Sequence, residues 1–388
     1  MSVVNAMVGG VTDETGRVVA TTDSSSASLL IDGRTIGPVS ASNGAVSFDV
    51  VGLAADTPYA WTVDDGESSI DGELYTFGVE GEPWDFTFAY SSCAGLNPLH
   101  RAMSGPAPER VSDHPVFDDV RAAKPRININ GGDWYYGDIG SGKHGLTSPD
   151  ADTYRAMYDA VLATRQGELY RNVPFVQVWD DHDYGPGDSD RTAPNRADAA
   201  QVYRERMPSY NLPAADNGGI YHSFMAGRVQ FVCLDTRYYR DPSSDAPPRT
   251  LLGSAQKTWL DGVLGSSEAR LLAVVQSQRW NTTGHGTGLG SYADERDELV
   301  TMFGDHGWLG RMFMLSGDIH GSGISSGASN PFGGFPLFHG GSLDSTPSPY
   351  GNGHGMDVGW ESARGQYLLI DIKDTAGWTR VSDVVWRS

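Results

Sequence analysis

The chain has 388 residues, enough for two domains and a large core. Its formal net charge of −21, from 28 basic and 49 acidic residues, argues against a protein that binds nucleic acid through a basic face, and it favours a soluble, self-repelling surface. Two cysteines are too few for a disulfide framework, no apolar run reaches the roughly 18 residues of a membrane span, and no signal peptide is visible.

Residues 1–82 are predicted to form an all-β domain. Short alternating strands recur, for example at 45–50 and 59–63, and Asp-Gly clusters mark turns between them. The pattern continues at 72–77, where it resembles the edge of a fibronectin-III-like sandwich. We find no catalytic constellation in this part, and we expect a second domain to span residues 83–388.

From residue 83 onward, strands alternate with amphipathic helices, which is the pattern of a layered α/β domain. Helices are expected over 115–123, 152–164, 196–207, 253–266 and 291–305. Strands are expected over 86–90, 127–130, 175–179, 229–235, 270–276, 312–315 and 367–372. The region 321–359 is rich in Gly, Ser and Pro and contains His339 and His354, which indicates long functional loops.

Four of these strands run directly into residues that can carry chemistry. The four junctions read FTFAY-SSC, ININ-GGDWYY, FVQVW-DDHD and MFML-SGDIH. In open α/β sheets, ligands gather at the carboxyl ends of the strands, and buried carboxylates must be paired, hydrogen-bonded or bound to metal. The sequence therefore predicts one shared metal centre at these strand ends.

Asp133 and Tyr136 belong to the second junction. Two glycines let the backbone turn tightly and bring the Asp133 carboxylate close to a metal, and Tyr136 can reach the same ion as a phenolate. The alternative is a turn aspartate beside packed aromatic residues. At the first junction, Cys93 is either a small buried hydrophobe or a thiolate ligand. Thiolate, carboxylate and phenolate together suit iron better than zinc or magnesium alone. Cys233, inside a strand, is expected in the core.

The third junction contains Asp180, Asp181 and His182. Successive residues of a strand alternate faces, so a turn must begin here if these side chains are to meet at one point. The Tyr-Gly-Pro-Gly sequence that follows supports such a turn. One of the two aspartates then binds metal, and His182 can face a substrate as an acid. A solvated acidic loop is the alternative, and we expect it for Asp183, Asp188 and Asp190.

The fourth junction places Asp318 and His320 two residues apart, so both point to one face of the strand. That spacing suits a carboxylate on one metal ion and an imidazole on its neighbour, and the alternative is a lone histidine. Arg237 also follows a strand, where its planar guanidinium can clamp phosphate oxygens. The alternative for Arg237 is an ion pair with Asp235 or Asp241.

In chain order, the motifs SSC, GGDWYY, WDDHD, LDTRYYR, LLGSAQKTWL and LSGDIH resemble those of the alkaline phosphatase D (PhoD-like) family of calcineurin-like metallophosphatases. The resemblance runs from about residue 86 to residue 320, and the N-terminal β-sandwich of the family agrees with residues 1–82. It implies an α/β, four-layer αββα metallophosphatase domain with a metal cluster at the strand ends.

The resemblance also implies the ligands and their ions. An iron(III) ion would be held by four residues: Cys93, Asp133, Tyr136 and His320. Asp133 would bridge to calcium, as one or two ions or another divalent ion, and Asp181 and Asp318 would complete that side. His182 would face the substrate.

Three features depart from the family pattern. Asp183 stands where the family usually has glutamate. Gln276 and Gln278 end a strand where many members of the superfamily have a histidine ligand, and either glutamine could ligate through its carbonyl oxygen. The region 321–359 matches no pattern of the family.

The expected activity is hydrolysis of a phosphate monoester by a metal-bound hydroxide. Arg237 would neutralise charge on the phosphoryl oxygens, and His182 would protonate the leaving oxygen. The first alternative is a phosphodiesterase or phospholipase-D-like hydrolase with the same metal site. The second is a non-catalytic, calcium-stabilised extracellular binding protein. From the resemblance we expect a secreted or periplasmic protein that acts on small-molecule phosphate esters, and the sequence leaves the oligomeric state open.

Overall fold

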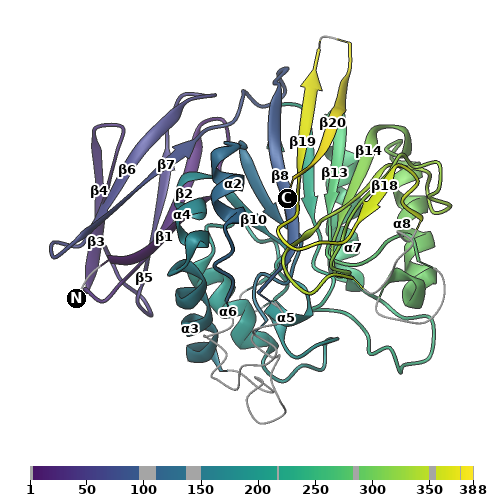
Figure 1. Ribbon diagram of the computed structural model, residues 1–388, viewed down its shortest axis with the longest axis horizontal. Coiled ribbons are helices and arrows are strands. Elements are labelled where there is room, and N and C mark those ends of the chain that lie inside the picture. The colour runs from purple at the N-terminus through teal and green to yellow at the C-terminus, as the bar shows by residue number, and fades with distance from the viewer. Residues whose placement is uncertain are drawn as a thin grey trace.

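The computed structural model describes residues 3–95, 111–136, 150–215, 218–282, 288–348, 355–375 and 377–387. His354 lies outside the described residues. The molecule is built in layers, from a small β-sandwich at one end to a pair of helices at the other (Figure 1).

The N-terminal strands form two antiparallel sheets that pack against each other. One contains β1 (Val3–Gly9), β2 (Thr15–Thr22) and β5 (Ala45–Val51). The other has the order β4-β3-β6-β7, formed by β3 (Ser26–Ile31), β4 (Arg34–Ser40), β6 (Pro58–Asp64) and β7 (Ser69–Tyr75). The sheets touch at Gly16, where a Cβ atom would lie 2.3 Å from Leu74 Cδ1. The expected all-β character of this part is confirmed.

Two mixed sheets form the centre of the rest of the chain. The first has the order β10-β9-β8-β19-β20, and β17 pairs with the carboxyl end of β8. Its strands are β8 (Phe86–Ala94), β9 (Ile127–Asn130), β10 (Phe175–Gln177), β17 (Ser342–Asp344), β19 (Tyr367–Asp374) and β20 (Thr379–Arg387). The second has the order β11-β12-β13-β14-β16-β15-β18. Its strands are β11 (His222–Ala226), β12 (Val229–Cys233), β13 (Leu271–Val275), β14 (Met312–Ser316), β15 (Ser322–Ser325), β16 (Leu337–His339) and β18 (Gly359–Glu361).

The two central sheets face each other through a buried aromatic core. The Phe88 ring lies with its centroid 5.6 Å from that of Phe231, edge to face, and 6.4 Å from that of Phe313. All three residues are buried, and Cys233 is buried in the same core, as expected. Aromatic pairs in these arrangements stabilise a core beyond the burial of their area.

Helices cover the outer face of each sheet. The first sheet is covered by α2 (Val116–Ala122), α3 (Ala151–Leu162), α4 (Arg165–Asn172) and α6 (Arg196–Arg206), and the second by α7 (Gly253–Ser266) and α8 (Ala293–Asp305). Shorter helical elements are α5 (Asp181–Tyr184), η2 (Leu289–Tyr292) and η3 (Leu309–Arg311). Buried side chains of α3, such as Met157, share a core with Phe175 of β10, whereas Leu260 of α7 packs with Leu272 of β13. The expected order of layers, helices outside two sheets, is therefore confirmed.

The region 321–359 was expected to form long loops, and this expectation holds only in part. Residues 326–336 form a loop, but the region also contributes β15, β16 and β17 and leads into β18. These strands have three or four residues each, too few for a clear local pattern, and pairing of β16 with β14 and of β17 with β8 supports their conformation. The helices α4 and α5 were also missed, since each is too short to show a clear helical period.

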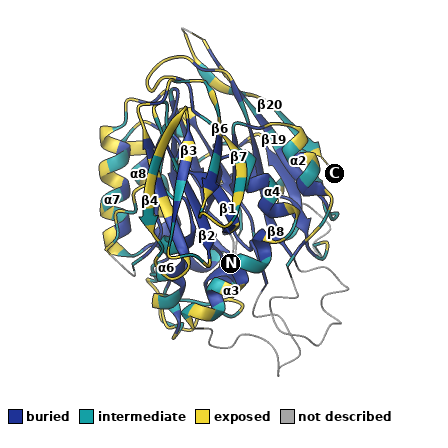
Figure 2. Cartoon of the chain, turned by 90° about the vertical axis from the view of Figure 1, so that its left-hand side faces the viewer, coloured by how far each residue is buried: buried dark blue, intermediate teal, exposed yellow. Residues whose placement is uncertain are grey.

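The sandwich is tied to the helical layer by close backbone approach. A Cβ atom at Gly72 of β7 would lie 2.4 Å from the carbonyl oxygen of Arg171 in α4. A Cβ atom at Gly9 of β1 would lie 2.6 Å from the carbonyl oxygen of Pro208. Figure 2 shows the buried strands of this part beside the more exposed β4 and the exposed outer residues of α7.

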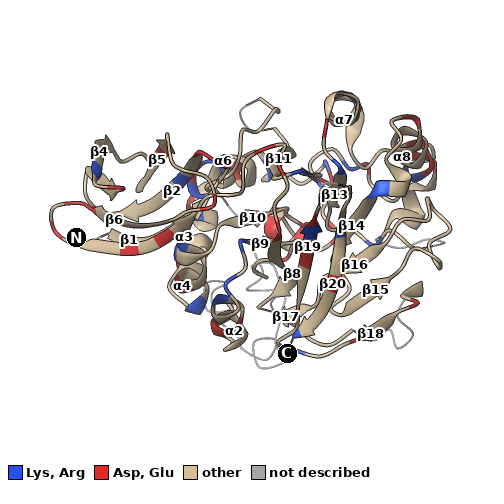
Figure 3. Ribbon diagram, turned by 90° about the horizontal axis from the view of Figure 1, so that it is seen from above, with Lys and Arg blue, Asp and Glu red and all other residues tan. Residues whose placement is uncertain are grey.

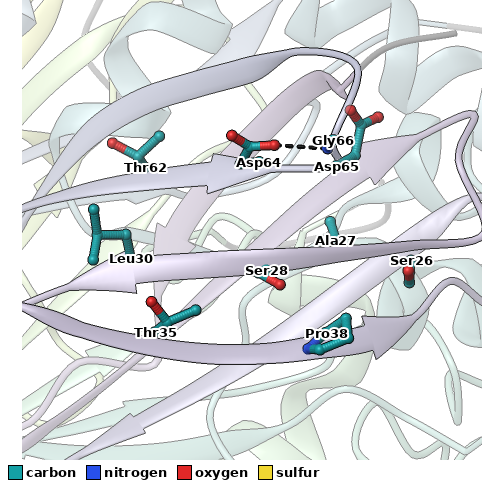
Figure 4. Close-up of a pocket in the computed structure, with 10 residues that line it drawn as sticks. All are labelled: Ser26, Ala27, Ser28, Leu30, Thr35, Pro38, Thr62, Asp64, Asp65 and Gly66. Atoms are coloured by element: carbon teal, nitrogen blue, oxygen red, sulfur yellow. Dashed lines mark hydrogen bonds between the residues drawn. The ribbon is translucent and has the colours of Figure 1, made fainter.

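A groove of about 450 Å³ lies on the four-stranded sheet of the sandwich (Figure 4). It is lined by Ser26, Ala27, Ser28, Leu30, Thr35, Pro38, Thr62, Asp64, Asp65 and Gly66. The Asp64 carboxylate accepts a hydrogen bond of 2.6 Å from the backbone N–H of Gly66. The groove shares no residue with the site predicted from the sequence. No helix among the described residues is long and apolar enough to cross a membrane.

His222 of β11 gives the fold a dependence on pH. The side chain is 1% exposed, its Nδ1 donates to the carbonyl oxygen of Ile220 (2.9 Å), and burial lowers its pKa from 6.5 to about 4. The folded state thus keeps His222 neutral while the unfolded chain binds a proton. Stability is fully present above pH 6.5 and falls as the pH drops towards 4.

We expect His222→Gln to flatten this dependence. Between pH 6.5 and pH 4 the free energy of unfolding should fall by about 3 kcal/mol less in the variant than in the wild type, since 2.5 pKa units correspond to about that much. Urea denaturation at a series of pH values measures the difference, in which the titration of all other groups cancels. Parallel curves for the two proteins would contradict this account.

Candidate metal centre

The carboxyl ends of four strands from both sheets meet at one place. β8, β9 and β10 run parallel to one another in the first sheet, and β14 ends beside them from the second. Contact between the ends requires glycine, since a Cβ atom at Gly317, just after β14, would lie 2.8 Å from the Gly131 carbonyl oxygen. At Gly132 (φ 103°) a Cβ atom would lie 2.6 Å from Asp180 Cβ. The sequence expectation that the four junctions converge is confirmed.

The first group of donor atoms surrounds Asp133. Its Oδ2 accepts a hydrogen bond of 2.8 Å from the Tyr136 hydroxyl, and Cys93 Sγ lies 3.6 Å from the same oxygen. His320 Nε2 lies 3.0 Å from the Tyr136 hydroxyl oxygen. Ligand atoms of Cys93, Asp133 and His320 all lie within 4.8 Å of one another. The sulfur of Cys93, the phenol oxygen of Tyr136, an imidazole nitrogen of His320 and a carboxylate oxygen of Asp133 thus lie close together.

Backbone strain is concentrated at these strand ends. Cys93, Asp133, Asp318 and His320 have φ values of 59°, 57°, 80° and 54°, in the left-handed region that residues other than glycine rarely adopt. Such conformations persist where surrounding structure holds them, and they cluster at functional sites. The four strained residues come from both sheets, and their side chains belong to neighbouring groups of donor atoms.

His320 is oriented by the region 321–359. Its Nδ1 lies 2.8 Å from the carbonyl oxygen of Thr346 and donates to it, because a carbonyl can only accept. The lone pair of Nε2 then faces Tyr136, as in many metal-binding histidines. Ser345 Oγ lies 3.4 Å from the Tyr136 hydroxyl. The contribution of Ser345 and Thr346 to the site could not be predicted from the sequence, because neither residue belongs to a recognisable motif.

A second group of donor atoms consists of Asp180, Asp181 and Asp318, whose carboxylate oxygens also lie within 4.8 Å of one another. Arg237 is fully buried against this group and contacts Asp180 Oδ1 and Asp181 Oδ1, the latter at 3.2 Å. Gln278 Nε2 donates to Asp180 Oδ1 at 2.7 Å. The expected ion pair with Asp235 or Asp241 is wrong, since the guanidinium pairs with Asp180 and Asp181, and only the backbone N–H of Arg237 donates to Asp235 Oδ1, at 2.9 Å. A contact between Arg237 and phosphate stays a prediction.

The two glutamines that follow β13 are engaged with protein groups. Gln278 Oε1 accepts a hydrogen bond of 3.0 Å from Arg240 Nη1, and Gln276 Oε1 accepts one of 2.6 Å from the backbone N–H of Gln278. Each carbonyl oxygen therefore has a donor already, and Gln278 acts as a support for Asp180.

Asp183 was expected to be a solvated loop residue, and this expectation is wrong. Its side chain is buried and accepts hydrogen bonds from the backbone N–H groups of Asp133 and Trp134, both at 2.7 Å, and of Asp180 at 2.9 Å. A single carboxylate thus ties the turn after β9 to the start of α5. Asp188 is exposed, as expected.

His182 lies at the rim of the site. It is half-buried, and the centroid of its ring lies 4.3 Å from that of the Tyr136 ring. The turn predicted after Trp179 is present as the short helix α5, which begins at Asp181. Because the chain turns here, the side chains of Asp180, Asp181 and His182 point in different directions. A ligand nitrogen of His182 lies within 4.8 Å of carboxylate oxygens of Asp133 and Asp181.

Electrostatics indicate that these residues fit bound cations. Burial raises the pKa of the Asp133 carboxyl, the Cys93 thiol and the Tyr136 hydroxyl well above their ordinary values, and it raises the pKa of Asp180 to about 7. Asp133 Oδ1 and Asp180 Oδ2 are buried without a hydrogen-bond partner. A nearby metal ion reverses such shifts and satisfies such oxygens. The donor set therefore fits metal ions better than it fits protons.

Asp181 behaves differently from its neighbours. Burial acts to raise the pKa of its carboxyl, but the charges of Arg237 and His182 outweigh burial and lower the pKa. The backbone N–H of Asp188 also donates to Asp181 Oδ2 at 2.6 Å. Acidic residues are spread along the whole molecule, from the sandwich to α8 (Figure 3), and four of the buried ones, Asp133, Asp180, Asp181 and Asp183, gather at this site.

Comparison with known proteins agrees with this geometry. The family model of PhoD-like phosphatase matches residues 88–362, which include all the site residues predicted from the sequence. Alkaline phosphatase D from Bacillus subtilis (strain 168) is 30% identical over 187 residues, which are 39% of this chain and 32% of that protein. The match thus spans about a third of the length of that relative.

Solved structures show the same fold. The structure of PhoD has a TM-score of 0.77 at 18% identity, covering 98% of this chain and 92% of that one. The purple acid phosphatase PPD1 from yellow lupin (Lupinus luteus) seeds has a TM-score of 0.62 at 12% identity, covering 98% and 73% of the two chains. Since the family model covers most of the chain, the protein belongs to the PhoD-like phosphatase family.

Proposed function

We propose that this protein is a metal-dependent hydrolase of phosphate esters, acting as a phosphomonoesterase of the alkaline phosphatase D type. The observation that carries the proposal is that neighbouring groups of donor atoms share residues. Asp133 belongs both to the group with Cys93 and His320 and to a group with Asp181 and His182, and Asp181 is shared in turn with Asp180 and Asp318. A continuous row of buried donors suits neighbouring ions, which are a common arrangement in phosphatases.

The donor chemistry supports an assignment of the ions. Cys93, Tyr136 and His320, together with Asp133, would hold iron(III), since thiolate and phenolate suit that ion. Asp133, Asp181 and Asp318 would hold calcium, one or two ions, or another divalent ion that prefers oxygen. When bound, the ions supply positive charge that activates a water molecule and offsets the charge of the phosphoryl group.

The residues of the chain have separate tasks in this proposal. Hydrolysis breaks the ester P–O bond, joins the oxygen of water to phosphorus and requires a proton on the leaving oxygen. His182, half-buried at the rim, is placed to donate that proton. Arg237 holds Asp180 and Asp181 in position rather than contacting the substrate, since its guanidinium is buried behind both carboxylates.

Three further features belong to the proposal. The chain divides into a sandwich domain, residues 1–82, and a catalytic domain, residues 83–388. The sandwich is of the fibronectin-III-like kind, which the strand orders β1-β2-β5 and β4-β3-β6-β7 support. The protein works outside the cytoplasm, in a secreted or periplasmic location.

Turnover of chromogenic phosphate monoesters and diesters, measured side by side, tests the preference for monoesters.

Substitution of Asp133 and of His182 should separate metal binding from catalysis. We expect Asp133→Ala to lose bound metal and activity together, because Asp133 is shared between donor groups. We expect His182→Ala to keep its metal and lose about 10²- to 10⁴-fold in kcat, the usual contribution of a positioned acid. Elemental analysis and steady-state kinetics measure the two effects. Asp152→Ala, at an exposed aspartate of α3, is the control and should change neither. Full activity in His182→Ala would remove that residue from the mechanism.

The visible absorption spectrum should show directly whether Tyr136 binds iron(III). A phenolate bound to iron(III) gives a charge-transfer band in the visible spectrum, and we expect Tyr136→Phe to lose this band while iron is retained by the other three ligands. The matched control is Tyr135→Phe, whose hydroxyl donates to the Asp183 carbonyl oxygen rather than facing Asp133. It should keep the band. Absorption spectra with iron analysis decide the matter, and a colourless wild type with calcium or zinc alone would refute the iron assignment.

A further inference from the structure

We infer that Arg279 is the side chain that binds the phosphoryl oxygens of the substrate. The inference rests on the proposed function, and it gives Arg279 the task that was expected of Arg237, because Arg237 is 0% exposed and the side chain of Arg279 is 15% exposed. It starts from the position of Arg279 at the carboxyl end of β13, next to the donor groups. Its Nε lies 3.5 Å from Asp318 Oδ2, at the edge of the row of carboxylates.

Three arginines in the described part of the chain lie against this site, and their burial distinguishes them. Arg237 is 0% exposed and Arg240 is 2% exposed, whereas the side chain of Arg279 is 15% exposed. A phosphate ester arrives from solvent, so it can meet only a guanidinium that reaches the surface of the site. That condition selects Arg279.

The hydrogen bonds of the other two arginines point inwards. Arg237 binds Asp180 and Asp181, and Arg240 donates to Gln278 Oε1 at 3.0 Å and to the Tyr292 hydroxyl at 2.9 Å. These are buried contacts that hold the donor residues and the end of β13 together. Arg279 forms an ion pair with Asp318, and the side chains of both residues are partly exposed, at 15% and 16%.

The backbone keeps Arg279 in place while its side chain faces the rim. Its carbonyl oxygen accepts a hydrogen bond of 3.1 Å from the N–H of Leu289. A Cβ atom at Gly288 would lie 3.2 Å from that carbonyl oxygen and from the Cβ of Arg279, so the neighbouring segment fits closely against it. The Nε atom of Arg279 is buried, but the side chain as a whole is 15% exposed. An arginine held in this way is suited to a planar contact with two phosphoryl oxygens.

The negative charges of the site explain why a contact between Arg279 and phosphate would be useful. Besides three aspartates of the second donor group, the rim contains His182, and a phosphate dianion approaching carboxylates needs a permanent cation nearby. Arg279 can provide that cation at the partly exposed edge of the carboxylates. The competing possibility is that Arg279 serves only to balance the charge of Asp318, and the two roles predict different losses on substitution.

The test compares Arg279→Gln and Arg279→Lys with the wild-type holoenzyme. We measure the Kd of inorganic phosphate by calorimetry, its Ki against a chromogenic monoester, kcat and KM, and the metal content. Arg279→Gln should weaken phosphate binding and raise KM about tenfold to hundredfold, since a hydrogen bond between charged groups is removed, with metal content unchanged. Arg279→Lys keeps the charge without the planar fork and should lose less. Arg380→Gln, on the exposed β19–β20 hairpin, should match the wild type.

Each other outcome overturns the assignment. Loss of metal from Arg279→Gln and Arg279→Lys would show that Arg279 balances the charge of Asp318. Unchanged phosphate affinity in a metal-loaded variant would show that Arg279 does not contact phosphate. If Arg279→Gln fails to fold, Arg279→Lys decides the same question. A metal-loaded wild type that neither binds phosphate nor hydrolyses any phosphate ester would instead refute the proposed function, and the inference with it.

Discussion

Buried negative charge at the strand ends is the constraint on which the rest of this structure depends. Asp133, Asp180, Asp181, Asp183 and Asp318 come from both sheets, and the side chains of four of them are nearly inaccessible to water. Isolated buried carboxylates would be very unfavourable, so each needs a counter-charge or hydrogen-bond donors. Arg237 meets this need for Asp180 and Asp181, and backbone N–H groups meet it for Asp183. Asp133 Oδ1 and Asp180 Oδ2 are buried without a hydrogen-bond partner, and the proposed metal ions would satisfy them.

The supports of the site are as specific as its ligands. Asp183 joins the turn after β9 to α5, Thr346 fixes the orientation of His320, and Gln278 holds Asp180. The region 321–359 takes part through β17, which pairs with the end of β8 and carries Ser345 into contact with Tyr136. Residues outside the two groups of donor atoms thus help to determine where the donor side chains point.

The different burial of Arg237 and Arg279 follows from the same constraint. A guanidinium buried between two carboxylates stabilises the empty and the occupied site alike by fixing those carboxylates, but it is not accessible to a substrate. Arg279, farther out on the same sheet, keeps part of its surface exposed. The same edge of the sheet therefore supplies a structural cation, Arg237, and a substrate-facing cation, Arg279. Both are arginines, and they differ in how deeply their side chains are buried.

The sequence by itself determined the all-β start, the alternation of strands and helices after it, and the four strand junctions with their candidate donor residues, because hydrophobic period and short motifs are local properties. The order of the layers was implied by the resemblance of those motifs to a known family. Only the tertiary structure decided which donors meet, which arginine is buried, and that Asp183 is a clasp instead of a solvated residue. Asp183 and its two donors after β9 are 50 and 49 residues apart, and Arg237 and Asp180 are 57 apart. Partners at such separations are selected by the packing of the two sheets, which no local pattern records, and for the same reason the short strands of 321–359 could not be recognised before their neighbours were in place.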